Sequence, residues 1–160
     1  MAIYMQLGNV PGTATDSVYP GWVVLQSVHW GLSVDVNTTV GQSGNRLSAG
    51  KITPSDVSIL KEFDLASVPL MKLAFGGVNS PTATIVVTQQ ATDSGQAYLT
   101  YTLSQVIISS FQVSASDSGK PIDNISLNFA KVEVKASPTD DTGKQINSIG
   151  GYDFSQALPI

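Results

Sequence analysis

Three copies of the tripeptide Asp-Ser/Thr-Gly are the part of this sequence that comes closest to a catalytic motif. They begin at Asp93, Asp117 and Asp141, at equal intervals along the chain. Aspartic proteases use this tripeptide, and their chemistry needs two such carboxylates that share one proton in a dry pocket. That arrangement requires apolar strands that lead into each motif.

The residues beside the three motifs are polar, which favours turns over catalysis. Ala91-Thr92 precede the first motif, Lys120 follows the second and Lys144 follows the third. Asp and Gly are favoured in turns because Asp hydrogen-bonds to its own backbone and Gly accepts a positive φ. We therefore interpret the motifs as hairpin tips, and we predict that the chain is not an enzyme.

His29 is the only imidazole in the chain and a possible general base. A catalytic triad also needs a nucleophile and an orienting carboxylate, and the sequence places neither beside it. Val23, Leu25, Ser27 and His29 share one face of a predicted strand, and because this face becomes polar toward its end, we expect His29 to point at water. With no Cys and one His, we predict no metal site, no cofactor and no catalytic residue.

The composition restricts the partners of the chain. Its 160 residues predict one domain, 1–160, with a core of its own. The net charge is −4 and the eight Lys and Arg are scattered from Arg46 to Lys144, which argues against nucleic acid as a partner. The uncharged stretch after Asp93 carries a polar residue at every second or third position, so we expect no membrane insertion. The N-terminal residues resemble no signal peptide, which predicts synthesis in the cytoplasm.

The low charge is itself informative. Only 12% of the residues are charged, against roughly a quarter in ordinary soluble domains. Soluble β proteins usually protect exposed strand edges with Lys, Glu or Pro, because unpaired backbone groups pair with other chains. We expect the unprotected surfaces here to be covered by further copies of the chain.

Most of the sequence predicts β structure, in a meandering sheet or barrel. Runs rich in β-branched and aromatic residues alternate with Gly, Pro, Asn and Asp turn signals. The predicted strands are Ala2 to Leu7, Trp22 to Trp30, Ile52 to Phe63, Thr82 to Ala91, Gln96 to Val113 and Ile125 to Lys135.

One helix is predicted, from Ser67 as N-cap to Phe75, with Gly76-Gly77 as the stop signal. Its apolar residues surround the helix axis almost completely and Lys72 is its one charge. The helix therefore plugs the end of its own barrel, or it lies between a sheet and another surface.

A long segment from Val34 to Gly50 is rich in Gly, Ser, Asn and Thr but contains three spaced apolar residues, Val36, Val40 and Leu47. Long loops in small domains are usually functional or disordered. These three residues predict either docking on a neighbouring subunit or packing on the same subunit.

The strand after Asn124 changes its apolar face. Ile125, Leu127 and Phe129 share one side, whereas Val132 and Val134 lie on the other. Because side chains alternate with period two, the strand needs a bulge or must pass from one packed surface to another. The second surface could belong to a neighbouring subunit.

These residues resemble the haemolysin-coregulated proteins (Hcp), which form the inner tube of bacterial type VI secretion systems. The similarity extends over nearly the whole chain. It is carried by Ala2-Ile3-Tyr4-Met5, Val10-Pro11-Gly12, Gly21-Trp22-Val23, Ser27-Val28-His29-Trp30-Gly31, Leu65-Ala66-Ser67, Leu70-Met71-Lys72 and, most specifically, Ile125 to Glu133. Tyr152 differs from the Trp that the family often has there.

The resemblance implies a β-barrel of two antiparallel sheets with one short α-helix and a long extended loop. It also implies rings of six subunits that stack into a hollow tube, which a contracting sheath expels together with the spike at its tip. The extended loop would correspond to about Val34 to Gly50 and would reach a neighbouring subunit or ring, so we predict that Lys in place of Val40 weakens ring stacking more than it weakens the fold. Ser27 and His29 would line the lumen, where the family shelters small effector proteins, and the protein would leave the cell through the secretion apparatus.

Two other functions fit the same sequence features. A tube protein of a phage-like or extracellular contractile injection system would share the fold and the ring. A glycan- or ligand-binding β-sandwich would also be acidic, Cys-free and rich in Ser, Thr and aromatic residues, but should expose an aromatic platform.

Overall fold

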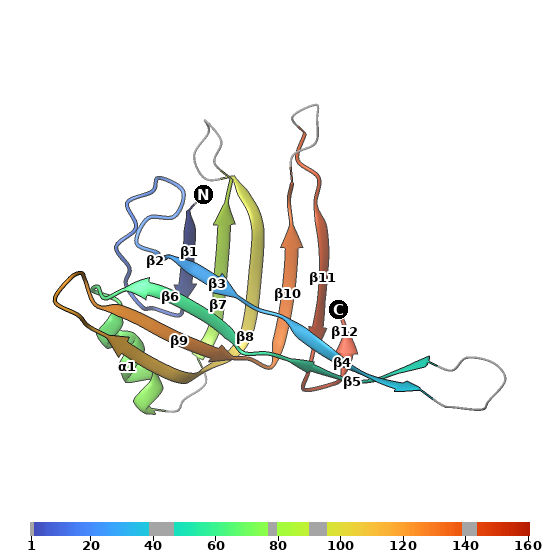
Figure 1. Cartoon of the computed structure of the whole chain (residues 1–160). Coiled ribbons are helices and arrows are strands. Elements are labelled where there is room, and N and C mark those ends of the chain that lie inside the picture. Colours follow the sequence, from blue (N-terminus) through green and yellow to red (C-terminus); the bar gives the residue numbers. More distant parts are fainter. Residues whose placement is uncertain (1, 39–46, 77–79, 90–95, 139–143) are drawn as a thin grey trace.

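The structure is a computed structural model that describes residues 2–38, 47–76, 80–89, 96–138 and 144–160 (Figure 1). The described residues form twelve strands and one helix. In chain order these are β1 (Ile3–Leu7), β2 (Val23–Leu25), β3 (Ser27–His29), β4 (Leu32–Thr38), β5 (Leu47–Pro54), β6 (Val57–Glu62), α1 (Ser67–Gly76), β7 (Ser80–Thr88), β8 (Ala97–Ser114), β9 (Ile122–Asn128), β10 (Lys131–Ala136), β11 (Ser148–Asp153) and β12 (Leu158–Pro159).

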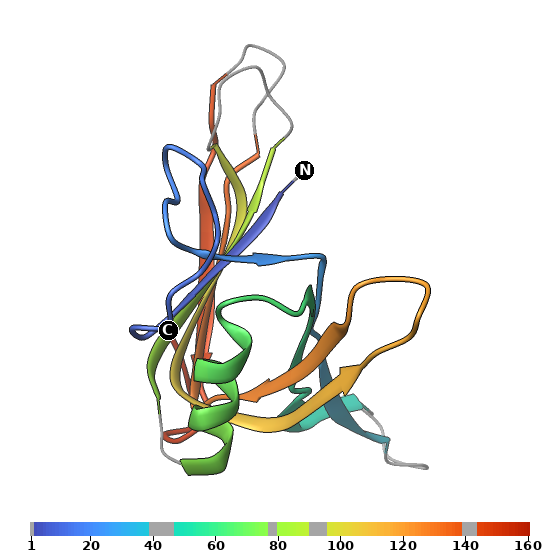
Figure 2. The ribbon, with the colours of Figure 1, turned by 90° about the vertical axis from the view of Figure 1, so that its left-hand side faces the viewer.

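The strands build two antiparallel layers. The large sheet has the order β12-β11-β10-β8-β7-β1-β2, and the small sheet consists of β3, β6, β9 and the C-terminal half of β8. Figure 2 shows the small sheet as a separate layer at an angle to the large one. The prediction of a mainly β fold with two antiparallel sheets and one short helix is confirmed, and among the described strands the layers stay open at their edges.

Strand β8 belongs to both layers and therefore sets their angle. Its N-terminal half pairs with β7 and β10, and its C-terminal half pairs with β9. Gln105 lies where β8 leaves the large sheet and has a positive φ of 55°. A register shift between Ile108 and Ser110 follows at once, as expected for a bulge that redirects a strand.

The change of face after Asn124 is the second crossing between the layers. Strand β9 pairs with β6 and β8 in the small sheet, and β10 pairs with β8 and β11 in the large sheet. Phe129 lies between these strands, and both it and Val132 are buried in the core of this chain. The predicted passage between two packed surfaces is confirmed, and the second surface belongs to the same chain.

Several predicted strands have different bounds in the structure. The strand predicted from Trp22 to Trp30 is divided at Gln26 into β2 and β3, and the strand predicted from Ile52 to Phe63 is divided at Ser55-Asp56 into β5 and β6. The segment predicted as the loop Val34 to Gly50 begins and ends as the paired strands β4 and β5. These divisions occur where the chain turns out of one sheet, which short-range alternation does not reveal.

The core fills the space between the two layers, and α1 covers one end of it (Figure 2). Helix α1 begins at the predicted Ser67 and packs against β8. Ser67 and Leu70 are buried, whereas Val68, Lys72 and Phe75 are exposed. The helix thus closes its own core with one face and leaves the opposite face free in the single chain.

Candidate functional site

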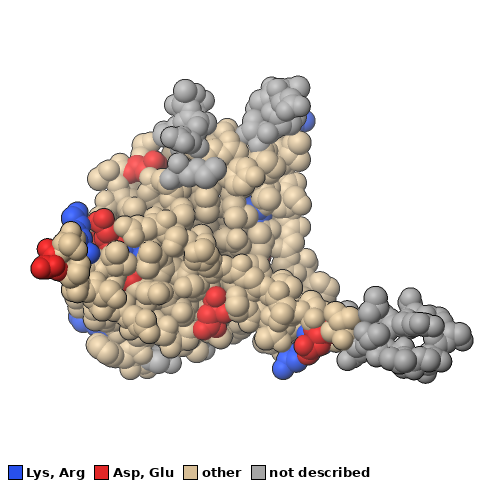
Figure 3. Space-filling model, viewed as in Figure 1, with Lys and Arg blue, Asp and Glu red and all other residues tan. Residues whose placement is uncertain are grey.

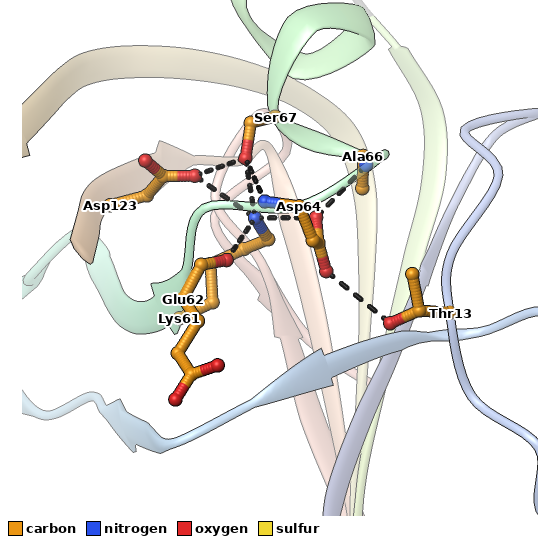
Figure 4. A network of polar contacts seen from close by, with 7 residues as sticks. All are labelled: Thr13, Lys61, Glu62, Asp64, Ala66, Ser67 and Asp123. Carbon is orange, nitrogen blue, oxygen red and sulfur yellow. Dashed lines mark hydrogen bonds and ion pairs between the residues drawn. The ribbon is translucent and has the colours of Figure 1, made fainter. Parts of the chain in front are cut away.

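A buried ionic cluster fixes the start of α1 on the small sheet (Figure 4). The Lys61 ammonium of β6 is completely buried and lies 2.9 Å from Asp123 Oδ2 of β9 and 2.9 Å from Asp64 Oδ1. It also donates to Ser67 Oγ at 2.8 Å and to the Glu62 carbonyl oxygen at 2.9 Å. Lys61 and Asp123 are direct neighbours across the β6–β9 pair, so the sheet register itself brings the two charges together.

The same cluster caps the helix. Ser67 Oγ donates to Asp123 Oδ2 at 2.5 Å and accepts from the Asp64 backbone N–H at 3.0 Å, and Asp64 Oδ1 accepts from the Ala66 N–H. These contacts satisfy the ammonium and the backbone N–H groups of Asp64 and Ala66, which directly precede the helix. The prediction of Ser67 as N-cap is therefore wrong, because Ser67 is the first helical residue and the Asp64 carboxylate accepts the hydrogen bond from the backbone N–H at the helix start. Asp123 Oδ1 is buried without a hydrogen-bond partner in the described part of the chain. The cluster is therefore a structural anchor that holds α1 in place.

The outer face of the small sheet carries the two residues predicted to face a lumen. Val28, Ile59 and Ile125 point toward the core, so their neighbours in sequence point outward. One outward row consists of His29, Ser58, Ser126 and Ser110, and the next consists of Ser27, Leu60, Asn124 and Gln112. The structure thus brings Ser27 and His29 together on one polar face, and His29 is exposed as predicted.

Charge is sparse on this face, and it lies at the margins. Figure 3 views the molecule from this side and shows most charged atoms near the β8–β9 connection and the hairpin, with one acidic spot between them. Glu62 pairs with Lys120 at 3.4 Å, and Asp56 accepts hydrogen bonds from Ser109 at 2.6 Å and Asn128 at 2.9 Å. The two outward rows between these carboxylates contain no Asp, Glu, Lys or Arg.

The small sheet has two open edges. Among the described strands, β3 pairs only with β6, and β8 from Ile107 to Ser114 pairs only with β9. Neither edge carries Lys, Glu or Pro, because the whole of β8 and β3 lacks them. Backbone N–H and C=O groups on such edges are available to another strand.

The predicted docking segment is a protruding hairpin. Strands β4 and β5 pair with each other as a separate two-stranded sheet that extends from the body of the molecule (Figure 1). Val36 in β4 is 62% exposed. Leu47 begins β5, opposite Thr38, and Val40 lies outside the described residues. Docking by these three residues stays a prediction.

An apolar groove of about 500 Å³ lies between the base of this hairpin and the inner face of β10 and β11. We call it the β10–β11 groove. Trp30, Leu32 and Ile52 line one side, and Val134, Ser148 and Tyr152 line the other. The groove continues the core outward, beyond the area that the small sheet covers.

Two groups of ionisable residues have shifted pKa values near the termini. Burial raises the pKa of Tyr4 and Tyr19 above the ordinary tyrosine value, and the nearby Asp16 carboxylate raises both further. A hydrogen bond from the Ser155 hydroxyl lowers the pKa of Asp153.

The Asp-Ser/Thr-Gly motifs lie at turns where the structure describes them. Asp117 is exposed in the connection between β8 and β9, and Asp93 and Asp141 lie outside the described residues. No group of three His, Cys, Asp or Glu side chains in the described ranges is placed to hold a metal ion. No helix within those ranges is long and apolar enough to cross a membrane.

Sequence reasoning missed three parts of this site. The ionic cluster joins residues far apart in the chain, and an isolated Lys in an apolar strand was its one signal. The β10–β11 groove needs β11, whose two glycines weaken a strand prediction. The open edges follow from the pairing of β8 with different partners along its length, which no local pattern encodes.

Comparisons with known proteins agree on one family. Residues 4–135 match the family described as "Type VI secretion system effector, Hcp". The protein hcp1 of Pseudomonas aeruginosa is 31% identical over 96 residues, which cover 58% of this chain and 58% of that protein. The match thus spans less than two thirds of the length of this relative.

Solved structures extend the similarity to the whole fold. A type six secretion system protein is 28% identical, with a TM-score of 0.91 over 99% of each chain. Hcp1 from Salmonella typhimurium is 21% identical, with a TM-score of 0.79 over 99% of this chain and 98% of its own, which shows a common fold. Since the family match alone covers most of the sequence, this chain belongs to the Hcp family of type VI secretion proteins.

Proposed function

We propose that this protein is the tube subunit of a type VI secretion system, with residues 1–160 as one tube domain. Copies of it form a closed ring, and rings stack into a hollow tube. The observation that carries this proposal is the four-stranded small sheet, which has two unprotected edges and a polar outer face nearly free of charge. Family membership supports the same function.

The ring closes when the β3 edge of one copy meets the β8 edge of the next. The two edges lie at opposite sides of one sheet, so the contact joins different surfaces and can be repeated around a circle. Each contact satisfies backbone groups that water must otherwise solvate. Charged residues at such an edge would lose hydration without gaining a partner, which explains their absence from β3 and β8.

The outer face of the small sheet then lines the lumen. Ser27 and His29 face this channel together with the Ser, Asn and Gln side chains of the two outward rows. A wall of short polar groups offers hydrogen bonds without strong charge, which suits the transient shelter of small effector proteins of varied composition. The number of six subunits comes from the family resemblance.

The β4–β5 hairpin connects rings in this proposal. It extends beyond the body of the subunit and exposes Val36 in a strand that, among the described strands, pairs with β5 alone. With Val40 and Leu47, it docks on a neighbouring subunit or on the next ring. The other partners are the sheath and the spike at the tip.

The protein acts without chemistry of its own in this proposal. It is synthesised in the cytoplasm, assembles, and is expelled by sheath contraction, and no catalytic residue, metal or cofactor takes part. The position of the chain in the Hcp family favours this function over a ligand-binding β-sandwich.

A native mass spectrum of the purified protein, with negative-stain images of the same sample, tests the proposal. A closed six-subunit species with annular particles is the expected result. A monomer at all concentrations up to the solubility limit, without annular particles, would refute ring formation.

A further inference from the structure

Helix α1 and the turn that precedes it present an exposed apolar stripe. Leu65, Val68 and Phe75 are 64%, 50% and 84% exposed, and Lys72 is the one charged residue between them. Val68, Lys72 and Phe75 are four and three residues apart, so they lie on one side of the helix. Phe75 is the most exposed of the large apolar side chains in the described ranges. We call these four residues the α1 stripe.

The β10–β11 groove is the matching unfilled surface. It is lined almost entirely by apolar groups. The strands that line it, β10 and β11, and the base of the hairpin lie at the opposite end of the molecule from α1 (Figure 1). A side chain placed in it would contact Trp30 and Leu32 on one wall and Val134 and Tyr152 on the other. Aromatic anchors in such pockets commonly dominate the energy of protein interfaces.

The positions of the stripe and the groove connect both to the open edges of the small sheet. Helix α1 packs against β8, whose C-terminal half is one open edge. Trp30 and Leu32 directly follow β3, which is the other open edge. A contact between the β8 edge of one copy and the β3 edge of the next therefore brings the α1 stripe of the first copy alongside the groove of the second.

We propose that the α1 stripe of one subunit seats in the β10–β11 groove of the neighbouring subunit within the same ring, with Phe75 as its anchor. This inference rests on the proposed ring and identifies the surface that closes it on the side away from the lumen. The occupant is a second copy of this chain, because both surfaces belong to every subunit and lie at opposite ends, as a repeating contact requires.

Cysteine crosslinking tests this contact sharply, because the chain contains no Cys. The test variant combines Val68→Cys in the stripe with Ser148→Cys in the groove. A short bismaleimide should link it into a ladder of covalent oligomers that ends at the closed ring. Each single variant should stay uncrosslinked, since the contact joins two different surfaces.

The matched control combines Val68→Cys with Lys135→Cys. Lys135 pairs with Ile149, one residue along from Ser148, and points to the opposite face of the sheet. This control should form rings without covalent links. If the Val68→Cys/Ser148→Cys variant forms rings that do not crosslink, this inference is wrong and the proposed function is unaffected. If wild type forms no rings, the proposed function is refuted, and the inference with it.

Replacement of the anchor gives a second readout. Phe75→Ser should raise the dissociation constant between subunits by about tenfold or more, because it removes a central aromatic contact. The melting temperature of the dissociated monomer should stay unchanged, since Phe75 is exposed there. Equal ring stability in Phe75→Ser and wild type would contradict the role of Phe75.

Discussion

At the scale of single residues, Lys61 has the largest expected effect on stability. Its ammonium is fully buried, and Asp123, also fully buried, is its direct partner. Lys61→Met should lower the free energy of unfolding by about 3–5 kcal/mol, because it leaves the Asp123 carboxylate buried and unpaired. Urea unfolding at a concentration where the protein is monomeric measures this loss.

The double variant Lys61→Met/Asp123→Leu is the control for this prediction. It removes both charges at once, so it should be clearly more stable than Lys61→Met alone. If the double variant loses as much free energy of unfolding as the two single variants lose together, the two side chains do not stabilise each other.

Two tyrosines near the N-terminus, the partly buried Tyr4 and the buried Tyr19, predict a loss of stability at alkaline pH. Their pKa values in the folded state are raised, so the unfolded chain releases these protons first. Their contribution is complete below the ordinary tyrosine pKa of about 10 and disappears as the pH rises through the folded values. Above about pH 10, the melting temperature of Tyr19→Phe should therefore fall less steeply with rising pH than the melting temperature of wild type. An identical decline in both proteins would argue against this cause.

At the scale of elements, the bend of β8 depends on the backbone of Gln105. A φ of 55° is unusual for a residue with a side chain, and its steric cost is highest for a β-branched residue. Gln105→Val should lower stability by about 1–2 kcal/mol, whereas Gln105→Gly should be neutral or slightly stabilising. Equilibrium unfolding of the two variants measures the contrast, and a more stable Val variant would contradict the assigned strain.

The pairing of β10 with β11 depends on one of two adjacent glycines. A Cβ at Gly151 would lie 2.5 Å from the Val132 carbonyl oxygen, whereas a Cβ at Gly150 would meet nothing within 4 Å. Gly151→Ala should therefore lower the melting temperature markedly, because the backbones of the two strands must separate. Gly150→Ala is the matched control and should melt like wild type. Equal melting of the two variants would exclude a close approach at Gly151.

The helix and the strands also show which parts of the fold local sequence patterns predict. The position of the helix, the long strand through Gln105 and the change of face at Phe129 were predictable, because helix stop signals, alternation and phase are local. The capping residue was not, because Asp64 takes that role through a turn that precedes the predicted Ser67. The division of Trp22 to Trp30, the strands of the hairpin and β11 were not predictable in this way. Each depends on which distant strand is its partner, and the period-two pattern does not identify that partner.

At the scale of the whole molecule, the low charge has a structural explanation. Uncharged residues occupy both edges and the outer rows of the small sheet. The charged residues that the structure describes lie at the margins of that sheet, in the Lys61 cluster, in loops, on α1, in the β4–β5 hairpin and on β10 and β11 of the large sheet. From the sequence, the deficit predicted self-association but did not identify the surfaces. The topology offers candidates for these surfaces, because it leaves both edges of the small sheet open and places the α1 stripe and the groove at opposite ends.

The hairpin should separate stacking from ring closure. Val36 is exposed and lies in the protruding hairpin, outside the small sheet, so Val36→Lys should leave ring formation and the monomer melting temperature unchanged. The charge should prevent stacking, because docking would bury an unpaired ammonium. Negative-stain images should then show single rings where wild type forms tubes. Val36→Thr is the control, because it keeps the shape of the side chain without the charge, and its rings should still stack. Two results for Val36→Lys would contradict a hairpin that connects rings without closing them: the loss of rings, or tubes as long as those of wild type.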